Sequence, residues 1–139
     1  LLNVEVSMNS CQFGGRIVTD ITLREVGQNK ISVGNFTIAI NRSYKKKDGS
    51  WEQKSSFARC VIWAEAAISL HKNYKKGDVI YIESALETES WTDTEGKKRS
   101  DNKFRVTNFY RPVGFKKSNE NSQVNIEQVQ ETPEEYIPF

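Results

Sequence analysis

Residues 57–63 read Phe57-Ala58-Arg59-Cys60-Val61-Ile62-Trp63. Side chains alternate between the two faces of a strand, so this stretch separates into two sets. The even-numbered residues are small and apolar, as expected for the interior of a small barrel. The odd-numbered set places two large aromatic rings, Phe57 and Trp63, on the same face as Arg59. The stretch therefore predicts a strand that buries one face and exposes the other.

Four further segments are rich in β-branched and aromatic residues, and turn signals separate several of them. Together with the first stretch they predict five strands, over residues 9–20, 31–44, 54–63, 78–91 and 103–110. One helix is predicted over residues 64–74, because Ala67, Leu70 and Tyr74 recur at helical spacing. An all-β chain of five strands, with one helix between the third and fourth, has the order of an OB-fold barrel. Length and strand count alone also allow another small β-barrel.

Charge is unevenly distributed along the 139 residues. All 20 lysines and arginines lie within residues 1–117, together with 13 of the 18 acidic residues. Residues 118–139 contain the remaining five acidic residues, all glutamates. A basic body suits a polyanionic partner such as nucleic acid, although a solvated surface with a charged tail has the same composition.

The chain is predicted to have three parts: an OB-fold domain (1–115), a flexible linker (116–132) and a protein-docking tip (133–139). The linker is polar and contains no aromatic residue, which is typical of a flexible segment. Apolar side chains then close an acidic tail, a pattern that favours docking. The docking residues are Glu134, Glu135, Tyr136, Ile137, Pro138 and Phe139.

Composition excludes several classes of protein. No run of about 18 apolar residues is present, so no membrane-spanning segment is expected. Two cysteines and one histidine exclude a Cys/His zinc finger, and no cofactor is predicted. No basic stretch followed by an apolar run begins the sequence, so we expect a cytoplasmic protein with reduced cysteines.

Exposed aromatic rings beside cations suit unpaired bases, since a base stacks on a ring while a cation meets the phosphate. Trp91 shares its predicted strand face with three glutamates, which argues against a core position. The candidates for base stacking are Tyr44, Trp51, Phe57, Trp63 and Trp91. Core packing or a dimer contact is the alternative for each. Trp51 is predicted in a loop, and Tyr44 has the parity of core residues, so only a bend or bulge would turn it outward.

Two basic clusters follow aromatic candidates in predicted loops. Residues 45–47 follow Tyr44, and residues 97–99 follow Trp91. These side chains can track phosphates, and solvated hairpin tips are the alternative. The full set predicted to contact phosphate is Arg42, Lys45, Lys46, Lys47, Arg59, Lys76, Lys97, Lys98 and Arg99.

Several motifs, in their order and spacing, resemble the bacterial-type single-stranded DNA-binding protein family, which bacteriophages also carry. They are Met8-Asn9 with Gly14-Gly15-Arg16-Ile17, Val33-Gly34-Asn35-Phe36-Thr37-Ile38-Ala39-Ile40-Asn41-Arg42, the stretch 57–63, Tyr74-Lys75-Lys76-Gly77-Asp78-Val79-Ile80-Tyr81-Ile82-Glu83, Trp91-Thr92-Asp93 and the closing Ile137-Pro138-Phe139. The resemblance implies an OB-fold that forms a homo-oligomer, usually a homotetramer, with a homodimer as the alternative. It implies single-stranded DNA wrapped over the protein and a tail that recruits replication and repair proteins.

The resemblance also implies roles for individual residues. Tyr44, Phe57, Trp63 and Trp91 fall on the family's base-stacking positions, and Arg59 and Lys76 fall where the family contacts phosphate. The chain departs from the family pattern at Glu65, Glu87 and Glu89, where basic residues are common. These carboxylates are expected to repel phosphate.

Two other functions stay open. An RNA-binding OB protein would use the same aromatic faces, because nothing in the sequence identifies a reader of the 2′-hydroxyl. An OB-fold nuclease would need clustered carboxylates holding a metal, or a histidine base. His71 is predicted on the exposed side of the helix, whereas Glu83, Glu87 and Glu89 share a strand face where a metal could bind.

Overall fold

The computed structural model describes residues 7–114. The predicted linker and tip therefore lie outside the described residues. The elements are β1 (Cys11–Ile17), β2 (Thr22–Val26), β3 (Ile31–Lys45), β4 (Trp51–Trp63), α1 (Ala64–Asn73), β5 (Val79–Thr92) and β6 (Lys98–Tyr110). Within residues 7–114, no helix combines the length and apolar character needed to cross a membrane.

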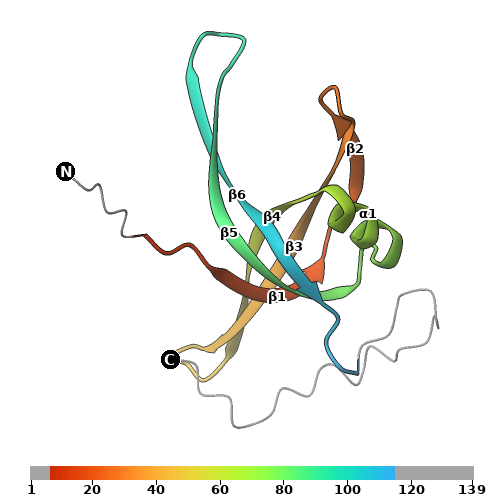
Figure 1. The fold of residues 1–139 in the computed structure, drawn as a ribbon. Coiled ribbons are helices and arrows are strands. Elements are labelled where there is room, and N and C mark those ends of the chain that lie inside the picture. The colour runs from red at the N-terminus through yellow and green to blue at the C-terminus, as the bar shows by residue number, and fades with distance from the viewer. Residues whose placement is uncertain (1–6, 115–139) are drawn as a thin grey trace.

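The strands form one sheet in the order β1-β5-β6-β4-β3-β2, and a second pairing between β1 and β3 closes it (Figure 1). The β4–β6 pairing is parallel and the other pairings are antiparallel. Five strands thus make a closed barrel, and β2 extends it along β3. Because α1 lies between β4 and β5, the third and fourth barrel strands, the predicted OB-fold order is confirmed.

The hydrophobic core fills the barrel and continues under the helix. Ile17, Ile38, Ile62 and Ile80 are at most 1% exposed, and α1 adds Ala67 and Leu70. The helical face is thus confirmed for these two residues. Tyr74 is also buried, but the helix ends one residue before it, at Asn73, and Tyr74 has extended backbone. In β6 the register with β5 shifts beside Thr107, and this bulge lets both Val106 and Phe109 reach the core.

The strand boundaries differ from the sequence prediction in two ways. The short β2 was missed, because its five residues are mostly exposed and show no apolar alternation. The hairpin strands are also longer than predicted: β4 begins at Trp51 and β6 at Lys98. Apart from Trp51 these added residues are polar, so backbone pairing and cross-strand contacts maintain the strands where no core lies beneath them.

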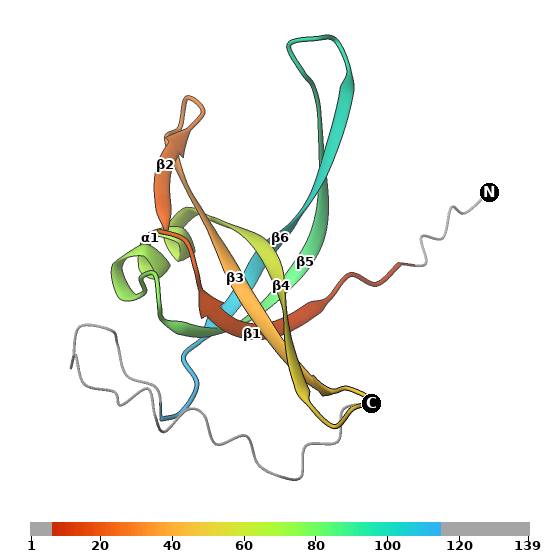
Figure 2. The ribbon, with the colours of Figure 1, turned by 180° about the vertical axis from the view of Figure 1, so that it is seen from behind.

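Two long hairpins extend beyond the core on opposite sides of the barrel (Figures 1 and 2). We call residues 41–56 the β3–β4 arm and residues 87–105 the β5–β6 arm. Each arm ends at a turn that the sequence predicted, the first at residues 47–49 and the second at residues 93–96. The arms carry most of the candidate DNA-binding residues.

Candidate nucleic-acid interface

The exposed face of β4 presents aromatic rings around a guanidinium. Phe57 is 66% exposed and Trp63 is 43% exposed, and Arg59 lies between them on the same face. Their even-numbered neighbours are at most 4% exposed, as the alternation predicted. Val61 is the exception on the outer face, because it is buried between its register partners in β3 and β6. The face is a row of exposed rings rather than a cavity.

Trp51 begins β4 and does not lie in a loop, so the predicted position was wrong. It pairs with Lys45, and the β3–β4 register runs without a shift from there to Trp63. Trp51 therefore points to the same side as Phe57, and it is 56% exposed. The aromatic row extends along the whole of β4.

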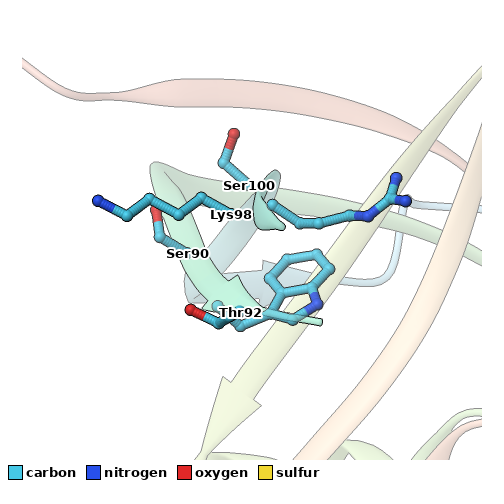
Figure 3. A pocket seen from close by; sticks show the side chains of 6 residues that line it. Ser90, Thr92, Lys98 and Ser100 are labelled. Atoms are coloured by element: carbon cyan, nitrogen blue, oxygen red, sulfur yellow. The ribbon is translucent and has the colours of Figure 1, made fainter. Parts of the chain in front are cut away.

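Trp91 lies in the outer part of the β5–β6 arm and is 45% exposed. Its register partner is Arg99, whose Nε donates to Asp93 Oδ2 at 2.9 Å. Trp91 and Arg99 both line a shallow hollow of about 390 Å³ (Figure 3). Its other lining residues are Ser90, Thr92, Lys98 and Ser100, which come from both strands. An aromatic face beside hydroxyls and cations can accept a base with its sugar and phosphate.

Ion pairs form a ladder between Trp63 and Trp91. Arg105 Nε donates to Glu87 at 2.5 Å, and Lys103 pairs with Glu89 at 2.8 Å. Arg59 pairs with Asp101, which joins β4 to the arm. A hollow of about 560 Å³, lined by Trp63, Glu87, Arg105 and Val106, lies along this ladder.

The ladder bears on the repulsion expected from Glu87 and Glu89. The carboxylates of Glu87 and Glu89 do face the surface that carries Trp91, but each is paired with a cation from β6. The four side chains of these two ion pairs together carry no net charge. The third acidic departure, Glu65, lies in the first turn of α1, where the helix dipole favours a carboxylate.

Tyr44 lies on the opposite side of the β3–β4 arm from Trp51. Its parity is that of the core face, and the unshifted register shows that no bulge turns it. It is partly exposed because the arm has left the barrel at this point. Its hydroxyl donates to Glu52 Oε2 at 2.5 Å, which raises the pKa of Tyr44 and lowers that of Glu52. No bend or bulge turns this ring to the outer face, and its partial exposure comes from its position beyond the barrel.

Most of the predicted basic residues lie near the ends of the two arms. Lys46 pairs with Glu52 at 3.4 Å, whereas Lys45 and Lys47 are exposed at the end of the β3–β4 arm. Lys45 was predicted in a loop but is the last residue of β3. On the other arm only Lys97 lies in the turn, because Lys98 and Arg99 begin β6. Arg42 lies within β3, and Lys76 lies in an exposed turn before β5.

Sequence reasoning missed several exposed residues on the same surfaces. Lys54 lies beside Tyr44, with its Nζ 5.3 Å from the ring centroid. Tyr81 and Tyr110 are register partners on the outer face and are about half exposed. A Cβ on Gly14 would overlap the Tyr81 ring, so the glycine is needed for this packing. Tyr81 shares its parity with Trp91, and that signal could have identified it.

The histidine, the strand glutamates and the buried cysteine bear on the nuclease alternative. His71 is exposed, and no three His, Cys, Asp or Glu side chains of residues 7–114 form a group that could hold a metal ion. Glu83 accepts a hydrogen bond from the Tyr110 hydroxyl at 2.9 Å, so the three strand glutamates each have a partner. Burial raises the pKa of the Cys60 thiol to about 12, which leaves it protonated and unreactive at neutral pH.

Comparison with known proteins agrees with this architecture. Residues 8–112 match the model of the Single-strand binding protein family. The chain is 36% identical over 91 residues to single-stranded DNA-binding protein 1 of Lactococcus lactis, covering 66% of this chain and 59% of that protein. It is 31% identical over 91 residues to single-stranded DNA-binding protein 1 of Streptococcus pyogenes, covering 66% and 68%.

The fold has a solved counterpart. The Plasmodium falciparum SSB, in a complex with ssDNA, superposes with a TM-score of 0.68 at 18% identity, over 81% of this chain and 98% of that chain. The matched region spans 59% of the Lactococcus lactis protein and 52% of the Halalkalibacterium halodurans relative, which is 31% identical. The barrel order, the aromatic row and the family match lead to one conclusion: the chain belongs to the Single-strand binding protein family.

Proposed function

We propose that this chain binds and protects single-stranded DNA without sequence preference during replication, recombination and repair. The observation that carries the proposal is the row of exposed rings on β4, with Arg59 between Phe57 and Trp63. Stacking on such rings tolerates any base, and a duplex hides the base faces that the rings would need. The proposed action is binding alone, in the cytoplasm of a bacterium or of a phage-infected host.

A tryptophan fluorescence titration tests this function. A 35-nucleotide oligo(dT) is compared with a duplex of equal length at low and high salt. We expect strong quenching by the single strand and little by the duplex, because Trp51, Trp63 and Trp91 would lie against bases. If the single strand and the duplex quench equally and weakly, and high salt abolishes both responses, the protein has only a basic surface and no base-stacking site. Competition between oligo(dT) and oligo(U) measures whether the protein prefers DNA or RNA. DNA that stays intact after incubation with the protein and Mg²⁺ or Mn²⁺ argues against nuclease activity.

We also propose that the chain forms a homo-oligomer, a tetramer or else a dimer. Support comes from β1: within the described residues, Cys11–Gly15 pair with β5 on one edge, while only Arg16 and Ile17 pair with β3. An open strand edge can pair with another chain. The neighbouring Tyr81–Tyr110 patch supplies exposed aromatic area. Light scattering during gel filtration measures the oligomeric state, and a monomer at micromolar concentration would contradict the proposal.

A third proposal concerns residues 133–139, which lie outside the described part of the chain. We propose that this acidic and apolar tip recruits replication and repair proteins. Deleting Ile137–Phe139 is expected to abolish partner binding while DNA binding is kept or strengthened. Pull-down of purified replication proteins with full-length and truncated chains measures this, and retained recruitment by the truncated chain would overturn it.

A further inference from the structure

Within residues 7–114, one ion pair connects the β5–β6 arm to the outer face of β4. Arg59 Nη2 donates to Asp101 Oδ1, whereas the other two ion pairs of the ladder join β5 to β6 inside the arm. β4 and β6 are themselves paired at only two positions, Cys60 and Val61 of β4. The Arg59–Asp101 pair therefore lies where the backbone pairing between β4 and the arm has already ended.

The position of Asp101 explains why it needs a cation. Its register partner on β5 is Glu89, another carboxylate. Like charges placed directly opposite each other in a sheet destabilise the pairing. Each carboxylate is compensated separately, Glu89 by Lys103 at 2.8 Å and Asp101 by Arg59. The arm thus depends on a cation of β4, and this cation lies between the two exposed rings on the outer face of that strand.

The guanidinium in this pair stays within reach of solvent. The Arg59 side chain is 56% exposed, and that of Asp101 is 21% exposed. A phosphate can therefore approach Arg59 without any change in the barrel. Arginine binds phosphate as well as carboxylate, often through two parallel hydrogen bonds, whereas an ion pair between partly exposed groups is weak. Asp101 is thus a ligand that a DNA phosphate can replace.

We propose that Asp101 is an internal competitor of DNA for Arg59. In the free protein the carboxylate holds the guanidinium and ties the base of the β5–β6 arm to β4. A phosphate of single-stranded DNA displaces the carboxylate and releases the arm that carries Trp91. Asp101 therefore lowers the affinity for DNA and couples phosphate binding on β4 to movement of the arm. This inference rests on the proposed binding of single-stranded DNA and adds an autoinhibitory contact to it.

The experiment compares D101N with the matched control E95Q. Asparagine at position 101 keeps an oxygen that can accept from the Asn102 backbone, a bond of 2.9 Å in this structure, but it has no charge. Glu95 is an exposed carboxylate of the same arm and forms no ion pair within residues 7–114, so E95Q removes the same charge without freeing a cation. Binding of fluorescein-labelled oligo(dT) is measured by anisotropy at low salt. We expect D101N to bind about three- to fivefold more tightly, the upper part of the range for a partly exposed ion pair, and E95Q to change by less than about twofold.

A double-mutant cycle identifies the group through which Asp101 acts. In an R59Q background, D101N should give no further gain, because the cation that it would free is absent. An equal gain with and without Arg59 would show that only overall charge matters, and the competitor role would be overturned. Weaker binding by D101N would also overturn it, since that result indicates a structural role.

Motion of the arm supplies an independent readout. ¹⁵N relaxation of the arm amides in the free proteins should give lower order parameters in D101N than in wild type or E95Q. Equal order parameters would mean that Asp101 does not tie the arm to β4. If wild type binds oligo(dT) but D101N matches E95Q, the inference fails and the proposed function stands. If wild type does not bind oligo(dT), both fail.

Discussion

The two arms of the barrel both present an exposed tryptophan, but they arrange their charges differently. The β3–β4 arm contains five cations and two carboxylates, whereas the β5–β6 arm contains five of each. On the β5–β6 arm, Arg99, Lys103 and Arg105 pair with carboxylates of the same arm. Asp101 forms an ion pair with Arg59 of β4. On the β3–β4 arm, Lys46 pairs with Glu52, whereas Arg42, Lys45, Lys47 and Lys54 form no ion pair with another residue of 7–114. On the β5–β6 arm only Lys97 and Lys98 are unpaired in this sense.

The difference shows that the number of basic residues is a poor measure of the charge available to DNA. A cation already held by a carboxylate releases no counterion unless phosphate displaces that carboxylate. We therefore expect the β3–β4 arm to supply most of the salt-dependent affinity. The β5–β6 arm is expected to contribute through stacking on Trp91, which salt affects little.

Neutralising the tip of the β3–β4 arm should have the largest effect. The variant K45Q/K47Q removes the two lysines of the tip that form no ion pair, so the salt slope should fall by roughly 1.4 and affinity at 0.1 M salt by about 25-fold. Fluorescence anisotropy with labelled oligo(dT) measures both quantities. An unchanged slope would mean that the free lysines do not contact phosphate.

Replacing Trp91 tests the other arm. Trp91→Ala should weaken oligo(dT) binding by about tenfold, within the range for one stacked base, and Trp91→Phe should recover most of that loss. The salt slope should stay the same, because no phosphate contact is removed. A slope that falls in Trp91→Ala would show that the two arms do not divide the binding energy in this way.

Freeing the paired cations should make the arms more alike. In E87Q/E89Q, Arg105 and Lys103 lose their carboxylate partners, and one new phosphate contact would tighten binding about fivefold at 0.1 M salt. The quadruple variant E87Q/E89Q/K103Q/R105Q removes whole ion pairs and should bind as wild type does. Weaker binding by E87Q/E89Q would mean that the ion pairs hold the arm in its binding conformation. They would then not be keeping Arg105 and Lys103 from phosphate.

Much of the barrel could be predicted from alternation and turn residues. The stretch 57–63 has one apolar face, so its burial follows from the sequence. The outer parts of β4 and β6 have no such face, and their strand structure depends on cross-strand partners that a single strand cannot reveal. Tyr44 shows the same limit, because its parity is that of the core and its exposure depends on where the arm leaves the barrel.

The candidate site was predictable to a similar degree. Phe57, Arg59, Trp63 and Trp91 follow from parity alone. The pairing of Glu87 and Glu89 with Arg105 and Lys103 does not, because it depends on the register between two strands separated by a turn. Lys54 was missed for the same reason, since its importance comes from the cross-strand position of Arg42 and Tyr44.

The turns at the ends of the arms offer a smaller and more local test. An aspartate organises each turn. Asp48 accepts from the Ser50 backbone at 2.9 Å and from its hydroxyl at 2.6 Å. Asp93 accepts from the backbone of Glu95 and Lys97 and also from the Arg99 guanidinium. These bonds lower the pKa of both carboxyls, through Ser50 for Asp48 and chiefly through Arg99 for Asp93.

The sign of the pH effect follows from these directions. A carboxyl whose pKa is lowered in the folded state stabilises its turn above the ordinary pKa of 3.8, and that stabilisation is lost as pH falls through the lowered value. Carboxyl ¹³C NMR between pH 7 and 2 should therefore give both aspartates midpoints below 3.8. The variant R99Q should raise only the Asp93 midpoint, and Ser50→Ala only that of Asp48. Added salt should raise the Asp93 midpoint more, because a guanidinium is screened and a hydroxyl is not. Equal responses to salt would mean that Arg99 does not hold Asp93 in solution, and the cation would then be free for phosphate as on the other arm.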